Sequence, residues 1–347
     1  MIDRVAVIGA GSWGTTVAAL AARRAPTALW ARRPELAEEI TRHHRNTGYL
    51  PGVDLPDSLQ SSASLAEVVA GADLIVMAVP SHGFRPVLRA LGPQLAPRTP
   101  VLSLAKGLER GSHRRMTEVI CEELPGHVAG VLSGPNLARE IAAGQPAATV
   151  VAMADEATAT SVQQLLITDA FRVYTNPDVV GCEVAGATKN VLAIAAGMAS
   201  GFGLGDSSLA ALITRGLAEL GRLVVAMGGE RMTVAGLAGV GDLVATCTSG
   251  LSRNRRVGVE LGRGRALADI LDELHMVAEG VKSARPLVDM ASGFGVEMPI
   301  AEQMADVLDG RQSPGDVIPA LMARAAKSEF HGMPPAADGP PAAAPGP

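Results

Sequence analysis

Hydrophobic positions in the first half of the chain fall into short runs separated by longer helix-like segments. The short runs, rich in aliphatic and β-branched residues, lie at 5–8, 28–31, 74–79, 101–104, 128–132, 149–152 and 171–174. Short strands that alternate with helices predict parallel βαβ units. The run at 74–79 is apolar throughout, as is typical of a strand covered on both faces of its sheet. We therefore expect an α/β domain with a mainly parallel sheet over residues 1–177.

The strand signal stops near Pro177, where the composition shifts to Ala, Leu, Val and Met with charged positions at helical spacing. Helices are expected at 178–200, 206–227, 253–262, 279–293, 299–309 and 314–326. This pattern predicts an all-α C-terminal domain over residues 178–328. Residues 329–347 are mostly Pro, Ala and Gly, which bury too little apolar surface to offset the entropy of ordering. We expect a disordered tail there.

Length and composition fit this two-domain scheme. The chain has 347 residues, of which 48% are hydrophobic and 19% charged, so each domain can bury a sizeable core. The formal net charge of −5 argues against a general nucleic-acid binder, which needs a broad basic surface. A local basic pocket for a small anion remains compatible with that charge.

Cysteine and histidine usage indicates a reducing compartment and no metal site. The three cysteines, Cys121, Cys182 and Cys247, form neither a CxxC pair nor a disulfide framework. We expect a cytoplasmic protein with idle thiols, the alternative being a catalytic thiol. The seven histidines include no HExxH motif, so we expect no metal.

No segment reads as a signal peptide or as a convincing membrane span. The first apolar run, at 5–8, is too short for a signal peptide and leads directly into glycines. The stretch 184–205 has Lys189 as its one charged residue, but its glycines, Thr188 and Asn190 make it a poor span. We interpret it as a helix buried inside a soluble domain and expect no stable membrane insertion.

A glycine motif follows the first predicted strand. Residues 9–14 read Gly-Ala-Gly-Ser-Trp-Gly, a GxGxxG sequence between a strand and a helix-like run. In such a loop Gly9 permits the tight turn, Gly11 lets a pyrophosphate approach the backbone, and Gly14 lets the helix pack on the strand. A GxGxxG motif alone is weak evidence for a dinucleotide site, and the alternative is that the glycines form an ordinary turn. The context is that of a Rossmann-type dinucleotide site.

The end of the second predicted strand bears on cofactor choice. NAD sites place an acidic residue there for the ribose 2′-hydroxyl. This chain has Arg32 and Arg33 instead, and guanidinium groups attract a 2′-phosphate. We therefore expect NADP(H) as the preferred cofactor, with NAD(H) accepted as well. The alternative is that one arginine is only a solvated loop charge.

Several polar residues stand among small or apolar neighbours. Lys106 follows a buried strand, Lys189 lies in an apolar helix, and Asp242 follows a Gly-Val-Gly segment. A lysine buried in an apolar helix is unfavourable unless it is paired, and such a group can donate or accept a proton. A snorkelling side chain is the alternative for Lys189. The basic cluster 252–256, Ser-Arg-Asn-Arg-Arg, reads as a binding loop or as a solvated helix face.

Taken together, these motifs resemble the bacterial NAD(P)-dependent glycerol-3-phosphate dehydrogenases over residues 4–326. The most specific stretch is 236–247, Gly-Leu-Ala-Gly-Val-Gly-Asp-Leu-Val-Ala-Thr-Cys, followed by Ser-Arg-Asn at 252–254. The segments 9–14, 133–138, 186–190 and 279–280 match as well. The resemblance implies reversible reduction of dihydroxyacetone phosphate to sn-glycerol 3-phosphate with NADPH, which supplies phospholipid synthesis.

The resemblance also implies roles for individual residues. Lys189 would be the general acid or base. Substrate contacts are implied for Lys106, Gly134, Asn136, Lys189, Asp242, Ser252, Arg253 and Asn254. Together with the glycine motif, cofactor contacts are expected for Gly9, Gly11, Ser12, Trp13, Gly14, Arg32, Arg33, Lys106, Ala138, Arg253, Val277 and Glu279. Asn136 departs from the family, which usually has a serine after Gly-Pro, so its contact is left open.

Two kinds of alternative remain. Other two-domain dehydrogenases, of 3-hydroxyacid or 6-phosphogluconate type, share the alternating half but lack the Gly-Asp and Ser-Arg-Asn sequences. A non-catalytic dinucleotide sensor on the same fold is the other, because fold does not determine function. The sensor has no need for Lys189, Asp242 and Arg253 together. The long apolar helical part weakly favours a homodimer.

Overall fold

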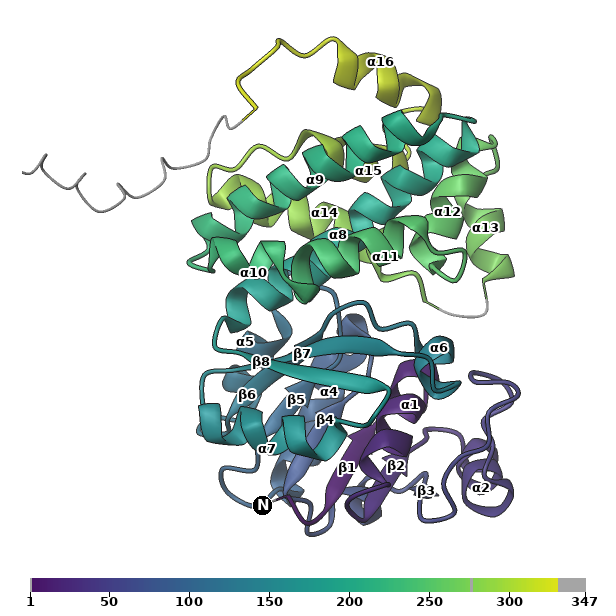
Figure 1. Ribbon diagram of the computed structural model, residues 1–347, viewed down its shortest axis with the longest axis vertical. Coiled ribbons are helices and arrows are strands. Elements are labelled where there is room, and N and C mark those ends of the chain that lie inside the picture. The colour runs from purple at the N-terminus through teal and green to yellow at the C-terminus, as the bar shows by residue number, and fades with distance from the viewer. Residues whose placement is uncertain (1, 275–276, 330–347) are drawn as a thin grey trace, which may run out of the picture.

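The computed structural model describes residues 2–274 and 277–329. A sheet-containing part and a helical part stack along the long axis of the molecule (Figure 1). The sheet has eight strands in the order β3-β2-β1-β4-β5-β6-β7-β8. They are β1 (Val5–Ile8), β2 (Thr27–Trp30), β3 (Gln60–Ser62), β4 (Leu74–Met77), β5 (Val101–Ser103), β6 (Ala129–Ser133), β7 (Ala147–Met153) and β8 (Phe171–Asn176).

Strand pairing confirms the prediction of a mainly parallel sheet. Six neighbouring pairs are parallel, and β6 with β7 is the antiparallel one. All seven expected strands are present, with ends displaced by a few residues. Strand β3 was not predicted, because its sequence Gln-Ser-Ser has no apolar alternation, and it forms only by adding to the edge at β2.

Helices cover both faces of the sheet. They are α1 (Ser12–Ala21), α2 (Pro34–His43), α3 (Leu65–Val69), α4 (Ser81–Leu91), η1 (Gly92–Gln94), α5 (Met116–Glu123), α6 (Ala138–Ala142) and α7 (Glu156–Leu166). Val5 and Val7 of β1 join a core that includes Val17 of α1, whereas Ala6 and Ile8 join the opposite core. Two-sided burial explains why the central strands are apolar at every position.

The remaining described chain is helical, as the sequence predicted. Its elements are α8 (Val179–Gly201), α9 (Asp206–Ala226), α10 (Arg231–Ala235), η2 (Leu237–Gly241), α11 (Asp242–Thr248), α12 (Arg253–Gly262), α13 (Leu267–Glu273), α14 (Glu279–Gly293), α15 (Pro299–Leu308), η3 (Pro314–Asp316) and α16 (Val317–Met322). The expected helix at 314–326 is thus shorter and begins with a 3-10 turn. Elements α10, η2, α11 and α13 were not predicted, because glycines interrupt the helical spacing between 228 and 252 and α13 is short.

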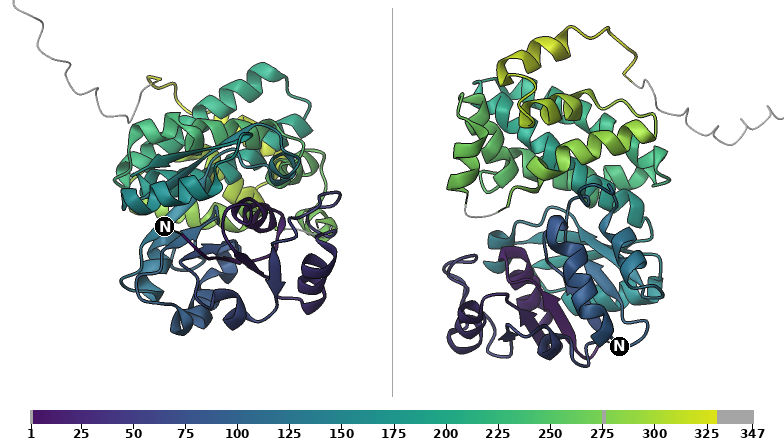
Figure 2. Two further views of the ribbon diagram at one scale, coloured as in Figure 1. Left: turned by 60° about the horizontal axis from the view of Figure 1, so that its bottom comes forward. Right: turned by 180° about the vertical axis from the view of Figure 1, so that it is seen from behind.

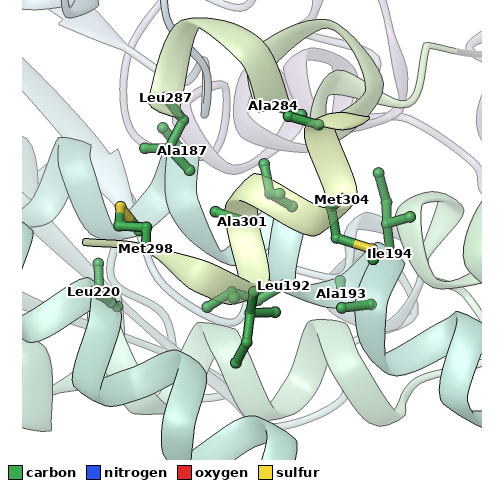
Figure 3. Close-up of a cluster of buried hydrophobic side chains, with 14 of the residues drawn as sticks. Ala187, Leu192, Ala193, Ile194, Leu220, Ala284, Leu287, Met298, Ala301 and Met304 are labelled. Atoms are coloured by element: carbon green, nitrogen blue, oxygen red, sulfur yellow. The ribbon is translucent and has the colours of Figure 1, made fainter. Parts of the chain in front are cut away.

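Helix α8 is the core of this part. It is long and apolar enough to cross a membrane, but 89% of its apolar window is buried inside the protein. Figure 3 shows Ile194 of α8 beside Met304 of α15, and Ala187 of α8 beside Leu287 of α14. Since other helices surround α8, the prediction of a buried helix is confirmed.

A buried carboxylate ties α8 to the sheet part. Glu183 accepts hydrogen bonds from the Thr117 backbone N–H at 2.9 Å and from Arg115 Nη1 at 2.7 Å. Both partners belong to the N-terminal end of α5. The two parts of the chain are therefore joined by buried polar contacts where α8 begins.

Glycines let α8 and α12 cross with their backbones in contact. A Cβ atom added to Gly258 of α12 would lie 1.9 Å from the carbonyl oxygen of Ile194. A Cβ atom added to Gly197 of α8 would lie 2.0 Å from the carbonyl oxygen of Arg255. Backbone atoms cannot rotate away as side chains can, so this crossing requires glycine on both helices.

This crossing predicts a large stability difference between two Gly→Ala variants. Gly258→Ala should lower the free energy of unfolding by at least roughly 1–3 kcal/mol, because α8 and α12 must separate. Gly221→Ala in α9 is the matched control, since the nearest atom to its Cβ lies 4.0 Å away. Better helix propensity should stabilise it by up to about 1 kcal/mol. Urea unfolding checks both values, and equal stability of the two variants would contradict the close crossing.

Candidate active site

The glycine motif forms the loop that the sequence predicted. Gly9 has φ of +120°, and a Cβ there would lie 2.9 Å from the carbonyl oxygen of Ala78. A Cβ on Gly14 would lie 2.0 Å from the carbonyl oxygen of Gly9, so α1 packs directly on the turn. A Cβ on Gly11 meets no atom within 4 Å. The free space at Gly11, at the start of α1, fits a pyrophosphate group that approaches backbone N–H groups.

Two arginines follow β2 beside this loop. The Arg33 guanidinium lies over the ring of Tyr49, 5.8 Å from its centroid. Arg32 and Arg33 are both exposed, and within residues 2–274 and 277–329 neither forms an ion pair. Two guanidinium groups without an ion pair, at the end of the second strand, could therefore bind a phosphate.

Three further residues expected at the cofactor, Ser12, Trp13 and Ala138, lie at the same loop and the start of α1. Ser12 donates its hydroxyl to the carbonyl of Tyr49 at 2.6 Å. Trp13 packs against Phe171 in a T-shaped arrangement, with ring centroids 6.4 Å apart. The carbonyl of Ala138 accepts a hydrogen bond from Thr16 of α1 at 3.3 Å. The chain thus brings α6 and the 44–50 loop against the start of α1.

The polar centre of the molecule is a carboxylate between two ammonium groups. Asp242 Oδ1 accepts from Lys189 Nζ at 2.8 Å, and Asp242 Oδ2 accepts from Lys106 Nζ at 2.7 Å. Lys189 comes from α8, Asp242 begins α11, and Lys106 follows β5 of the sheet part. Asp242 is 1% exposed and Lys189 7% exposed. The structure therefore joins three residues that the sequence singled out separately.

Burial and charge act on this triad in opposite directions. Burial, together with the charge of Lys189, lowers the pKa of Lys106 to about 8, although Asp242 raises it. Burial alone would raise the pKa of Asp242, but the two ammonium groups lower it by more. Asp242 is therefore a carboxylate, and Lys106 can change its protonation state near neutral pH.

Each lysine keeps one donor for a ligand. An ammonium carries three N–H groups. Lys189 uses two, on Asp242 and on Thr246 Oγ1 at 2.7 Å, and Lys106 uses two, on Asp242 and on the Gly134 carbonyl at 2.7 Å. The third N–H of each is free among the residues described. A ligand oxygen near these groups could accept a hydrogen bond from an ammonium group, which could also transfer a proton to it.

A closed circuit of hydrogen bonds fixes the backbone of Lys106. Its N–H donates to Glu279 Oε2 at 3.2 Å, and its carbonyl accepts from Asn190 Nδ2 at 2.8 Å. Asn190 Oδ1 accepts from Asn254 Nδ2 at 2.8 Å, and Asn254 Oδ1 accepts from the Gly280 N–H at 3.0 Å. The circuit returns to Lys106 through Glu279, which also accepts from the Ser81 N–H at 3.2 Å. Helices α8, α12 and α14 thus hold the loop after β5.

The Ser-Arg-Asn segment forms the start of α12 beside this circuit. The Ser252 hydroxyl caps the helix by accepting from the Arg255 N–H at 3.2 Å. Asn254 is buried in the circuit, whereas Arg253 is exposed and makes no hydrogen bond or ion pair to the described part of the chain. The cluster therefore begins a helix, with Ser252 and Asn254 buried and Arg253 exposed to solvent.

Three expected residues, Gly134, Asn136 and Val277, are not members of the triad. Gly134 has φ of +132° and offers its carbonyl to Lys106. Asn136 turns its amide toward Thr149 Oγ1 at 3.0 Å, and its own Oδ1 is buried without a partner in the described structure. Val277 is half-buried just before α14. The side-chain amide of Asn136 therefore donates a hydrogen bond to β7.

Three residues of the site were given no role by the sequence. Thr246 lies one turn after Asp242 on α11, so i,i+4 spacing from an acidic residue could have flagged it. Asn190 adjoins Lys189 within a motif that drew attention only to the lysine. Tyr49 lies in an irregular loop, and no local pattern could place its ring under Arg33.

No cysteine or histidine of the described chain forms a hydrogen bond or ion pair with Lys106, Lys189 or Asp242. Cys182 and Cys247 are buried and Cys121 is exposed, all three as free thiols. Burial raises the pKa of the Cys247 thiol to about 12. Across the described ranges, no group of three or more His, Cys, Asp or Glu side chains is arranged to hold a metal ion.

Comparison with known proteins covers both parts of the chain. Residues 4–159 match the N-terminal family of NAD-dependent glycerol-3-phosphate dehydrogenase, and residues 178–319 match its C-terminal family. The chain belongs to the NAD-dependent glycerol-3-phosphate dehydrogenase family. The 3-hydroxyacid and 6-phosphogluconate alternatives are thereby set aside.

Curated relatives agree with this assignment to the glycerol-3-phosphate dehydrogenase family. Glycerol-3-phosphate dehydrogenase (NAD(P)+) 2 of Sphingopyxis alaskensis is 55% identical over 328 residues, 94% of this chain and 98% of the relative. The enzyme of Thermobifida fusca is 51% identical over 96% of this chain and its own full length.

A solved structure extends the agreement to three dimensions. The crystal structure of glycerol-3-phosphate dehydrogenase from Coxiella burnetii matches with a TM-score of 0.89 and 36% identity. The match covers 93% of this chain and 99% of that one. The order of a sheet part and a helical part is thus the architecture of the family.

The triad predicts a pH-dependent stability defect for Asp242→Asn. The variant leaves two buried ammonium groups without a counter-charge and should lose roughly 3–5 kcal/mol of unfolding free energy at pH 7. The pKa of Lys106 is lowered to about 8 in the native fold, and loss of the Asp242 charge lowers it further in the variant, so the penalty on this ammonium is absent once the pH is above about 8.

The defect should therefore be smaller at pH 9.5 than at pH 7. Urea unfolding at both pH values measures it. Asp272→Asn, an exposed position on α13, is the control and should change stability little at either pH. An equal loss at pH 7 and 9.5 for Asp242→Asn would contradict the charged state assigned to Lys106.

Proposed function

We propose that this member of the family reduces dihydroxyacetone phosphate to sn-glycerol 3-phosphate with NADPH, reversibly. The observation that carries the proposal is the buried Lys106–Asp242–Lys189 triad at the joint between the sheet and the helical part. It provides two positively charged donors that share one carboxylate, and such donors can stabilise the charge that develops on a carbonyl oxygen during reduction. The names of the curated relatives support the same reaction.

In this proposal residues 1–177 hold the dinucleotide and residues 178–328 supply the substrate pocket. When bound, the nicotinamide provides the hydride. The loop around Gly9, Gly11 and Gly14 receives the pyrophosphate, and Arg32 with Arg33 receives the 2′-phosphate of NADP(H). Ser12, Trp13, Ala138, Val277 and Glu279 complete the cofactor contacts that the family implies.

Lys189 is assigned the proton transfer. Its ammonium is oriented by Asp242 and Thr246, and its free N–H donates to the ketone oxygen while hydride arrives at the carbon. In the reverse direction the neutral amine accepts the proton of the hydroxyl. Asp242 acts as the orienting carboxylate, because its lowered pKa prevents it from delivering a proton.

The phosphate of the substrate is assigned to the start of α12. Arg253 is exposed and has no partner in the described structure, and it can bind a phosphate through two parallel hydrogen bonds. Ser252 caps α12 next to Arg253, and Asn254 is linked to the backbone of Lys106 through Asn190. Lys106, Lys189 and Arg253 outnumber Asp242 and Glu279, so the pocket is cationic within a chain of net charge −5.

The wider setting follows the family. We infer a cytoplasmic enzyme that supplies glycerol phosphate for phospholipid synthesis, with NAD(H) as a second cofactor, and a homodimer. The sensor alternative has no use for a buried lysine pair on one carboxylate, because retaining two unneeded ammonium groups in the interior would only destabilise the fold.

Substitution of Lys189 tests the reaction directly. Lys189→Met removes the proton and should lower kcat for dihydroxyacetone phosphate by roughly 10²–10⁴-fold. Lys189→Arg keeps a charge but cannot release a proton at neutral pH, so it should lose kcat as well. Steady-state kinetics measures kcat, and fluorescence titration confirms that NADPH still binds. Retention of more than about a tenth of the native kcat by both variants would transfer the role to another residue.

The double substitution Arg32→Ala and Arg33→Ala tests cofactor choice. Each lost hydrogen bond to a charged group is worth roughly 1.5–3 kcal/mol, so the KM for NADPH should rise at least about tenfold. The KM for NADH should change little, because NADH has no 2′-phosphate. Equal increases for NADPH and NADH would contradict the assignment of the two arginines.

A further inference from the structure

A cavity lies in the helical part, and none of its lining residues belongs to the triad. It has a volume of about 1070 Å³ and is lined by one face of α9, by residues 295–300 and by the C-terminal segment 318–329. This segment, α16 and the residues after it, passes over the end of the molecule farthest from the sheet (Figures 1 and 2). We call this cavity the α9 groove.

Positive charge predominates in the α9 groove. Its lining includes Arg215, Arg222, Arg231, Arg324 and Lys327 against Glu219, Glu297 and Glu329. Glu219 is 2% exposed and is already engaged by the backbone N–H groups of Ile300 and Ala301, at 2.8 and 3.3 Å. Burial raises the pKa of Glu219 to about 7, so its negative charge is incomplete at neutral pH.

Two arginines of α9 make no direct ion pair with the acidic side chains of the groove in the described structure. Arg215 and Arg222 lie two turns apart on one face, and each donates only to a backbone carbonyl, those of Glu329 at 3.3 Å and Glu297 at 3.2 Å. Neither forms an ion pair with any residue that the structure describes. Burial lowers the pKa of Arg222; the charges of Glu219 and Glu297 raise it, and repulsion from Arg215 and Arg324 lowers it. An anion between these guanidiniums would remove that repulsion.

The walls of the groove are aliphatic. They include Leu212, Val225, Ile318, Leu321 and Met322, and the described lining contains no aromatic ring. A nucleotide or other ring compound would find no stacking surface, whereas an alkyl chain would be covered by branched side chains. Met322 is 79% exposed, so an occupant would cover apolar surface that now faces water.

We propose that the α9 groove binds a long-chain anion, with its head between Arg215 and Arg222 and its alkyl chain along the aliphatic wall. The relevant chemistry is a single alkyl chain with a phosphate or carboxylate head, as in a lysophospholipid or a fatty acid. The site lies outside the catalytic pocket and does not depend on the reaction proposed above.

Isothermal titration calorimetry of the full chain with monododecyl phosphate, below its critical micelle concentration, tests this site. Saturable binding is expected. Decyl phosphate, two methylenes shorter, should bind about tenfold more weakly. Inorganic phosphate and dodecyl maltoside, which have only the head charge or only the chain, should bind far more weakly still. Dodecanoate, compared with dodecyl phosphate, distinguishes a carboxylate from a phosphate head.

Three variants locate the site. Arg222→Gln should weaken dodecyl phosphate about tenfold, the effect of one charged hydrogen bond. Ala211→Trp, which fills the groove from the exposed face of α9, should abolish binding. Arg311→Gln is the control, because Arg311 lies on the helical part but pairs with Asp306 and Asp309 outside the groove. It should leave affinity unchanged.

Several outcomes would overturn the proposal. They are the absence of saturable binding, equal affinity for dodecyl maltoside, and unchanged affinity in both Arg222→Gln and Ala211→Trp. Sedimentation velocity, which measures the oligomeric state, tests whether a second copy of the chain occupies the groove instead. If Ala211→Trp dissociates a dimer and the native protein binds no dodecyl phosphate, a second copy of the chain occupies the groove.

Discussion

The buried carboxylate of Asp242 is the interaction on which the site depends. Two ammonium groups, one from each part of the chain, reach the interior only because Asp242 lies between them. An isolated buried charge is strongly unfavourable, whereas a triad with one net charge and further hydrogen bonds to Thr246 and Gly134 is tolerated. The same pairing leaves one N–H of each ammonium without an acceptor among the described residues.

The position of the triad follows from backbone packing. Glycines at the crossing of α8 and α12 bring Asn190 beside Asn254, and the circuit through Glu279 holds Lys106. The π-helical turn η2 sets the start of α11, because a Cβ on Gly239 would lie 2.0 Å from the carbonyl oxygen of Val234. The glycines of the family motif therefore position Asp242, although none of them has a side chain to offer a ligand.

Much of the fold and several residues of the site could be predicted from the sequence, for reasons that differ from one residue to another. Apolar runs on β1 and β4 predicted buried parallel strands, and the glycine motif predicted the loop before α1. Lys106, Lys189 and Asp242 stood out because charge among apolar residues needs a partner. Their mutual pairing lay beyond local pattern, since the hydrogen bonds join positions 53 and 136 residues apart. Strand β3, the ring of Tyr49 and the roles of Asn190 and Thr246 depend likewise on tertiary contacts.

The most direct test of the central claim compares NADPH oxidation with two ketones. The account requires a cationic pocket in which Arg253 and the lysine pair together recognise a phosphorylated ketone. Dihydroxyacetone phosphate should be reduced with a kcat/KM roughly 10³-fold or more above that of dihydroxyacetone, because the unphosphorylated ketone leaves the phosphate-binding groups unpaired. Equal kcat/KM for the two ketones, or no oxidation of NADPH with either, would contradict the account.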